Sequence, residues 1–262
     1  MLPYIEIFGK IIPWYGIMMV LGFGIAGCVA ALLCKRNGIE RYDLVYSAVY
    51  TVIGAMLGAK LLFILVEIPD LVSGKYSILD VLQGGFVFYG GLIGGIFCLW
   101  LYCKQFHLEF SRFGDVYATV VPLGHAFGRV GCFMGGCCYG MEYDGPLHYV
   151  YQYKFKGAAT PLGVPLLPVQ LIEATILLIV FVGMLLLYFR KNRRTWDQVI
   201  YYATAYAVIR FTLEFFRGDA ARGSLLFFST SQWISLGLFA FAVVIILLRA
   251  RRAKTEPPTT AA

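Results

Sequence analysis

The sequence predicts an all-α, polytopic membrane protein with about seven transmembrane helices and a small extracytoplasmic cap. Of its 262 residues, 60% are hydrophobic and 14% are charged, whereas charged residues make up about a quarter of an ordinary soluble domain. The mean hydropathy is +0.74, and apolar stretches of about 20 residues recur along the chain. Together these observations exclude the soluble multi-domain classes.

Seven apolar segments, separated by breaker and charged residues, are expected to span the bilayer. We expect residues 1–250 to form one integral membrane domain, with a tyrosine-rich outer head at about 141–167 that lies at the headgroup level. Residues 251–262 are expected to be a disordered cytoplasmic tail. The expected spans are roughly 12–33, 43–66, 86–103, 114–132, 168–189, 197–213 and 231–249.

Basic residues are distributed unevenly between the two sides of these spans. If the N-terminus lies outside, the cytoplasmic segments hold thirteen lysines and arginines and the outer segments hold six. The positive-inside rule therefore predicts an outside N-terminus and an inside C-terminus. Because the charges gather at the ends of apolar segments, the net charge of +7 does not indicate a nucleic-acid partner.

Three cations, Lys60, Arg129 and Arg210, fall inside or at the edge of a predicted span. A cation at the bilayer centre costs about 2.5–3.5 kcal/mol on insertion scales, so each needs a reason to be there. Any one of them could extend to the headgroups from a span end. Three at similar depth on one side suggest instead a shared cavity for an anion, and the commonest anion in a membrane is a lipid phosphate.

Two further charges follow Arg210 at helical spacing. Glu214 lies four residues later and Arg217 seven residues later, so all three are expected on one helical face. Glu214 would then partly neutralise Arg210. The glycine-rich segments 84–95 and 124–140 allow close helix packing or expose N–H groups to an anion; we favour packing for Gly54/Gly58 and Gly94/Gly95.

With these residues identified, the chain resembles the prolipoprotein diacylglyceryl transferase family over nearly its whole length. The resemblance rests on the order of several short motifs, since none of them is specific alone. These are WYGIMMVLGF at 14–23, GAMLGAKLLF around Lys60, GGFVFYGGLIGG at 84–95, Asp115 with GRVGCFMGG at 128–136, PVQLIEA at 168–174 and RFTLEFFRGD at 210–219.

This resemblance implies an enzyme that moves the diacylglyceryl group of phosphatidylglycerol onto the lipobox cysteine of a prolipoprotein, forming a thioether and releasing glycerol phosphate. It implies a monomer in the bacterial cytoplasmic membrane that needs no cofactor and no metal. By resemblance, Arg129 and Arg210 hold the lipid phosphate, Glu214 orients Arg210, and Tyr15 lines the site. The remaining expected substrate-binding residues are Lys60, Gly90, Gly91, Cys132, Gly140 and Arg217.

The sequence departs from the family pattern where a catalytic base is expected. The family's histidine is Tyr89, the asparagine of its signature is Cys132, its glutamate is Cys137, and its later asparagine is Gly135. Three alternatives for ionising the substrate thiol stay open. Tyr89 or His125 could take the proton, or the positive field of the arginines could suffice, because a thiol pKa of about 8.5 needs only a modest downward shift.

Cys132, Cys137 and Cys138 follow Arg129 closely. A disulfide from Cys132 to either of the other two would staple the loop on an oxidising side of the membrane. Zinc, with His125 or His148 as a fourth ligand, ranks below a structural role because no paired second cysteine motif exists. Two other functions remain as alternatives: a diverged relative with cysteine-based redox or metal chemistry, and a transporter of an anionic solute, against which the lack of an internal repeat counts.

Overall fold

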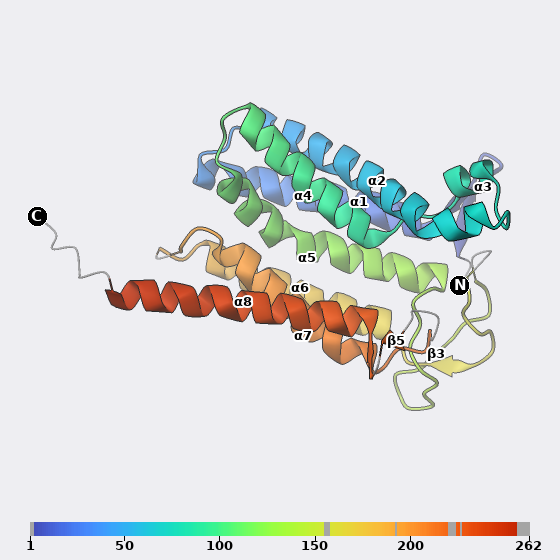
Figure 1. Ribbon diagram of the computed structural model, residues 1–262. Helices are drawn as coiled ribbons and strands as arrows, with labels where there is room; N and C mark the ends of the chain where they lie inside the picture. Colours follow the sequence, from blue (N-terminus) through green and yellow to red (C-terminus); the bar gives the residue numbers. More distant parts are fainter. Residues whose placement is uncertain (1–2, 155–157, 192, 220–223, 226, 256–262) are drawn as a thin grey trace, which may run out of the picture. The chain divides into compact units, whose positions relative to one another are not determined.

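The computed structural model describes residues 3–154, 158–191, 193–219, 224–225 and 227–255 (Figure 1). The predicted all-α polytopic fold is confirmed, and seven of the helices lie on the seven predicted segments with ends that differ by a few residues. The helices are α1 (Trp14–Leu33), the 3-10 helix η1 (Cys34–Asn37), α2 (Arg41–Val72), α3 (Ile78–Gln83), α4 (Phe88–Gln105), α5 (Phe110–Gly135), α6 (Val169–Tyr188), α7 (Asp197–Glu214) and α8 (Thr230–Thr255).

Short antiparallel strand pairs, which the sequence analysis did not predict, join some of these helices. β1 (Tyr4–Ile7) pairs with β2 (Lys10–Pro13) immediately before α1. In the expected outer head, β3 (Tyr149–Val150) pairs with β4 (Pro165–Leu166), and β5 (Ser224–Leu225) pairs with β6 (Phe228–Ser229) before α8. Residues 155–157 of the expected head, Arg222 and the last seven residues of the expected tail lie outside the described residues.

Four helices among the described residues are long and apolar enough to cross a membrane. They are Trp14–Asn37, Arg41–Val72, Val169–Tyr188 and Thr230–Arg249. Helices α4, α5 and α7 are less apolar; α5 carries Arg129, and α7 carries Arg210 and Glu214. The number of seven spans therefore stays a prediction. Helix α8 continues to Thr255, so helix extends into the segment expected to be a disordered tail.

The chain divides into two compact units. One unit comprises Met1–Val29 with Tyr117–Ala262, and the other comprises Ala30–Val116. In the second unit α2 and α4 lie side by side along much of their length (Figure 1). A Cβ atom on Gly90 would overlap the carbonyl of Gly58, and one on Gly94 would overlap the carbonyl of Gly54. The expected packing role of Gly54, Gly58 and Gly94 is thus confirmed.

In the first unit α6 packs against α7, and α7 packs against α8. Ala126, Ala174 and Leu177 form a buried cluster where α5 meets α6, with Tyr202 and Tyr206 of α7 packed against it. Many large apolar side chains of these helices face outward, as expected for helices in contact with lipid; examples are Ile179, Val182, Leu186, Phe241 and Val244. The interior of this unit consequently holds the polar residues.

Candidate functional site

The centre of the first unit is a buried ion pair between two helices. Arg129 of α5 places its Nε 3.0 Å from a carboxylate oxygen of Glu173 on α6, and the two side chains are 13% and 3% exposed. Glu173 lies in the first turns of a helix that is otherwise almost wholly apolar. A buried charge of this kind is retained only when a partner compensates it, so each residue fixes the other in place.

His125 lies one helical turn before Arg129 and faces the same carboxylate, as the spacing of four residues predicts. Its Nε2 is 3.9 Å from Glu173, and its Nδ1 is 3.2 Å from the hydroxyl of Tyr202. The ring also packs 5.1 Å from the ring of Tyr206. His125 is therefore part of a polar network that joins α5, α6 and α7.

A second ion pair lies on α7 and confirms the predicted pairing at a spacing of four residues. Arg210 Nη2 is 2.5 Å from Glu214, and both side chains are less than 10% exposed. The same Nη2 donates a hydrogen bond of 3.0 Å to the hydroxyl of Ser231 on α8. Arg210 Nη1 is buried and makes no hydrogen bond with the residues that the structure describes. A buried guanidinium donor of this kind is suited to bind an anionic oxygen.

The prediction that Arg217 shares a helical face with Arg210 and Glu214 is wrong, because α7 ends at Glu214. The chain turns there, and Arg217 instead forms an isolated bridge with Gly140. Its guanidinium donates two hydrogen bonds, of 2.8 and 2.7 Å, to the carboxylate of Asp219. Burial lowers the pKa of Arg217, but these bonds and the charge of Asp219 outweigh burial and raise it overall.

The structure nevertheless brings the three arginines together. Arg210 is close enough to Arg217 and Arg129 to interact electrostatically with both. Tyr206 interacts in the same way with Arg129, Glu173 and Arg210. Each arginine has a carboxylate partner of its own. The three carboxylates therefore offset the repulsion between the three buried guanidinium groups.

The three cysteines converge beside this cluster. The Sγ atoms of Cys132, Cys137 and Cys138 all lie within 4.8 Å of one another, and the structure records thiols rather than the disulfide that the sequence allowed. Hydrogen bonds from Cys132 and Cys137 lower the pKa of Cys138; burial opposes this shift, and Arg217 adds to it. The pKa of Cys137 is raised by its hydrogen bonds to Cys132 and Cys138 and by burial.

Tyr15 and Gly140 flank the same region. Tyr15 is 44% exposed at the start of α1, and its electrostatic neighbours are the three cysteines and Arg129. A Cβ atom on Gly131 would lie 3.2 Å from the Tyr15 backbone, so α1 and α5 approach closely at this point. Gly140 is buried, and a side chain there would overlap the carbonyl of Leu167.

Lys60 lies in the second unit, where its ammonium group binds backbone carbonyls. It donates hydrogen bonds of 3.0 and 3.1 Å to the carbonyls of Val81 and Gly84, at the C-terminal end of α3. The rings of Phe63 and Phe86 each lie 5.2 Å from it. This cation therefore caps a short helix, which is favourable because the C-terminal carbonyls carry partial negative charge. Its expected contact with substrate stays a prediction.

Tyr89, Gly90 and Gly91 also lie in the second unit, in the first turn of α4. The Tyr89 ring packs edge-to-face with that of Phe88. Gly90 is buried against α2, and a Cβ on Gly91 would lie 3.2 Å from the carbonyl of Ala55. Both glycines thus have a packing role, and binding of substrate by these three residues is untested.

The sequence analysis missed four residues of the network. Glu173 was quoted within a motif but was not recognised as the partner of Arg129, although an acidic residue in an otherwise apolar span is a strong functional signal. Tyr202 and Tyr206 gave no such signal, because tyrosines are common at membrane interfaces. The pairing of Asp219 with Arg217 could not be predicted, because it depends on the residue at which α7 ends.

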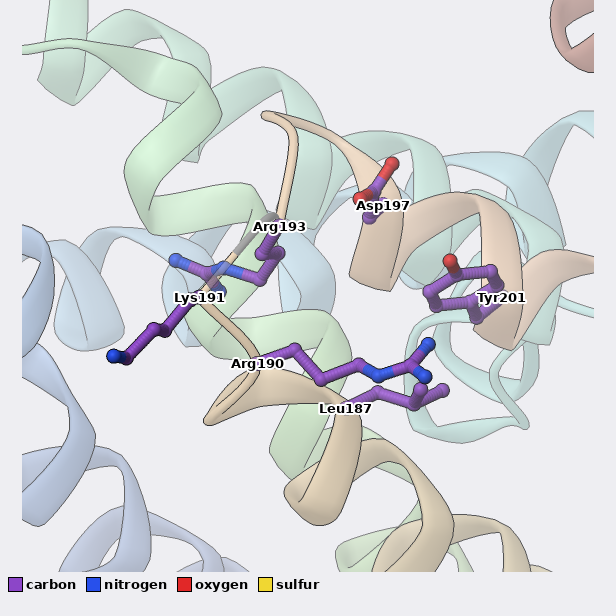
Figure 2. A pocket seen from close by; sticks show the side chains of 6 residues that line it. All are labelled: Leu187, Arg190, Lys191, Arg193, Asp197 and Tyr201. Carbon is purple, nitrogen blue, oxygen red and sulfur yellow. The ribbon is translucent and has the colours of Figure 1, made fainter.

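The arginine cluster is distinct from a pocket of about 350 Å³ at the far end of α6. Leu187 lines this pocket, and it lies about 21 Å from Glu173 along the helix axis at 1.5 Å per residue. Figure 2 shows Arg190 extending past Leu187 while the amine of Lys191 points away from them. The other lining residues are Arg193, Asp197 and Tyr201. Arg190, Lys191 and Arg193 are among the basic residues that the sequence analysis assigned to the cytoplasmic side, and that assignment stays a prediction.

Comparison with known proteins shows the family to which the chain belongs. The family model described as "Prolipoprotein diacylglyceryl transferase" matches residues 4–248. A phosphatidylglycerol–prolipoprotein diacylglyceryl transferase of Clostridium tetani is 35% identical, and the match covers 91% of this chain and 95% of that protein. Similar proteins of Clostridium perfringens and Dehalococcoides mccartyi are 31% and 33% identical, with at least 94% of either chain covered.

The buried pair predicts a large effect of removing one charge. Glu173→Gln leaves Arg129 without an anionic partner and should lower the free energy of unfolding by about 3–5 kcal/mol. Replacing both residues, as Arg129→Met with Glu173→Leu, should restore most of it. Thermal or denaturant unfolding in detergent measures the effect. The control is Glu109→Gln, at an exposed ion pair with Arg112; equal effects of Glu173→Gln and Glu109→Gln would contradict the central role of the buried pair.

Proposed function

Since the chain belongs to the prolipoprotein diacylglyceryl transferase family, we propose that it transfers the diacylglyceryl group of phosphatidylglycerol to the lipobox cysteine of prolipoproteins. The relatives' names state the phospholipid donor and the protein acceptor, and the chain is a helical membrane protein as such a reaction requires. The observation that carries the proposal is the buried pair of guanidinium groups on α5 and α7, of which Arg210 keeps a donor with no hydrogen bond among the described residues.

Donor counting explains how arginines that are already paired with carboxylates can still bind a phosphate. A guanidinium has five N–H donors, and a carboxylate occupies one or two of them. Arg210 uses Nη2 for Glu214 and Ser231, and its Nη1 remains for a ligand oxygen. The carboxylate partners keep the site neutral when empty, so the protein is stable before the lipid enters. Arg217 likewise donates two hydrogen bonds, both of them to Asp219.

The proposed reaction is a substitution at a glycerol carbon of the lipid. The acceptor sulfur forms a bond to that carbon, and the bond from the carbon to the phosphate oxygen breaks, so glycerol phosphate leaves with the electron pair. Negative charge therefore gathers on the phosphate oxygens as the reaction proceeds. Arg129 and Arg210, fixed in a medium of low dielectric constant, stabilise that charge more than water would.

The thiol proton has three candidate acceptors, which are His125, Tyr89 and water. We favour water over either side chain. His125 is held by Tyr202 and Glu173, which suits a structural contact in the helical bundle. Tyr89 lies in the first turn of α4, where its ring packs edge-to-face with that of Phe88, which suits a packing role. We propose that the positive field of the arginine cluster lowers the thiol pKa enough for the proton to pass to water.

Replacing either arginine should abolish transfer. Arg129→Ala and Arg210→Ala should each lower kcat/KM by at least about 100-fold, because each removes a donor aimed at charge that develops in the transition state. The assay follows the mass gain of a lipobox peptide in vesicles that contain phosphatidylglycerol. Arg190→Ala, at the far end of α6, is the matched control and should transfer normally. Full activity of Arg210→Ala at equal expression would contradict the phosphate site.

Two conservative variants distinguish the proton acceptors. Tyr89→Phe and His125→Gln should each keep kcat/KM within about tenfold of the wild type if no side chain acts as general base. A residue that does act as base contributes about 100- to 10,000-fold, so its loss would be plain. A decrease of that size in either variant, with unchanged thermal stability, would assign the proton transfer to that residue and overturn the field mechanism.

We also propose that the N-terminus lies outside and the C-terminus inside, with the pocket of Figure 2 on the cytoplasmic side. Fusions at the C-terminus test this orientation. Green fluorescent protein fused there should fluoresce, and alkaline phosphatase, which folds only outside the cytoplasm, should be inactive. Active alkaline phosphatase at this position would show the opposite orientation.

A further inference from the structure

The three cysteine sulfurs are brought together by the backbone at the end of α5. Cys132 lies in the last turn of the helix, and the N–H of Cys137 donates a 3.0 Å hydrogen bond to its carbonyl. Gly136 and Cys138 then adopt positive φ values of 67° and 57°. A positive φ is unusual for a residue other than glycine, and such strain is typical of functional sites. The turn folds two cysteines back over the helix end toward the third.

Other elements of the first unit hold this turn in place. Gln170 of α6, 1% exposed, donates a 2.8 Å hydrogen bond to the carbonyl of Cys137. The hydroxyl of Tyr151 donates to the carbonyl of Phe133 at 3.1 Å, and the hydroxyl of Thr160 donates to that of Gly136. The cysteine backbone is therefore fixed from several sides, as a preorganised ligand set requires.

The sulfur positions fit coordination of one soft cation. Tetrahedral zinc with Zn–S bonds of about 2.3 Å places its sulfurs about 3.8 Å apart, and the three Sγ atoms already lie within 4.8 Å of one another. Thiolates select soft ions and not magnesium or calcium. A disulfide would use two sulfurs and leave the third aside, whereas all three converge here. The geometry thus reverses the order in which the sequence alone ranked metal and structural roles.

The converging group consists of the three sulfurs alone among the described residues. Neither histidine that the sequence suggested as a fourth ligand belongs to it: His125 contacts Tyr202, and His148 contacts the carbonyl of Gly145. Zinc sites with three protein ligands leave the fourth position to water or substrate. A substrate thiol that enters this position is deprotonated by the metal.

We propose that Cys132, Cys137 and Cys138 bind one Zn²⁺ whose fourth position takes the thiol of the acceptor cysteine, so that the metal adds to the positive field of the arginines in ionising that thiol. The thiol releases its proton to water as it displaces the bound water molecule, and the coordinated sulfur then forms the bond to the glycerol carbon while glycerol phosphate leaves. Arg217 lies beside Cys138 and offsets the negative charge of the thiolates. Metal binding by the three cysteines is independent of the proposed function. The binding of the acceptor thiol at the fourth position rests on the proposed function.

The first measurement is the metal content of the full-length protein, purified in detergent without a histidine tag. We expect about one zinc per chain in the wild type. The triple variant Cys132→Ser, Cys137→Ser and Cys138→Ser should contain none, and the control Cys28→Ser, at an exposed cysteine of α1, should contain the wild-type amount. Because the triple variant could fail to fold, the reduced wild-type protein is also titrated with Cd²⁺. A thiolate charge-transfer band that saturates near one equivalent supports the site.

The second measurement tests the fourth position separately from turnover. Wild-type protein loaded with Co²⁺ is mixed with a lipobox peptide or with the same peptide carrying serine in place of cysteine, without phospholipid. Only the cysteine peptide should strengthen the thiolate-to-Co²⁺ absorption.

The outcomes separate the parts of the proposal. Absence of both zinc and the Cd²⁺ band in fully reduced protein, or a disulfide between two of the three cysteines in protein purified from membranes, overturns the metal site. If the Co²⁺ absorption does not change when the cysteine peptide is added, the metal site stands, but the proposed binding of the acceptor thiol to the metal is overturned. Full transfer by the Arg210→Ala variant, with metal and peptide binding intact, overturns the phosphate site and leaves the metal site standing.

Discussion

The ion pair between Arg129 and Glu173 is the constraint on which the first unit depends. It lies between α5 and α6, almost out of reach of solvent, where a single uncompensated charge would be strongly destabilising. The pair also fixes the distance between the helices, because the small residues Ala126 and Ala174 pack beside it. His125 and Tyr206 are arranged around the same carboxylate, so the position of α7 depends on it as well.

The sequence was informative where an interaction is local along the chain. The spacing from Arg210 to Glu214 predicted their contact because both belong to one regular helix. The helices themselves were predictable from long apolar segments. The same reasoning failed for Arg217, because a pattern of seven residues assumes a helix that in fact ends at Glu214. The pairing of Arg129 with Glu173 could not be predicted, since it depends on which helices become neighbours.

The departures from the family pattern also have a structural meaning. An isolated change from asparagine or glutamate to cysteine would remove polar groups from the site. Here Cys132 and Cys137 change together and have Cys138 beside them, and the turn at Gly136 brings all three sulfurs into contact. In the proposed zinc site, three thiols therefore stand where the family pattern suggests an asparagine and a glutamate. In sequence the three cysteines were only neighbours along the chain, and the left-handed turn that unites them was not evident.

The glycine contacts between α2 and α4 have a consequence for how that unit assembles. At Gly58 and Gly94 the backbones of α2 and α4 approach with no side chain between them, and their attraction comes from close-range dispersion and complementary shape. Such contacts owe little to the expulsion of solvent. The attraction between α2 and α4 at these glycines is therefore expected to persist when detergent replaces the lipid.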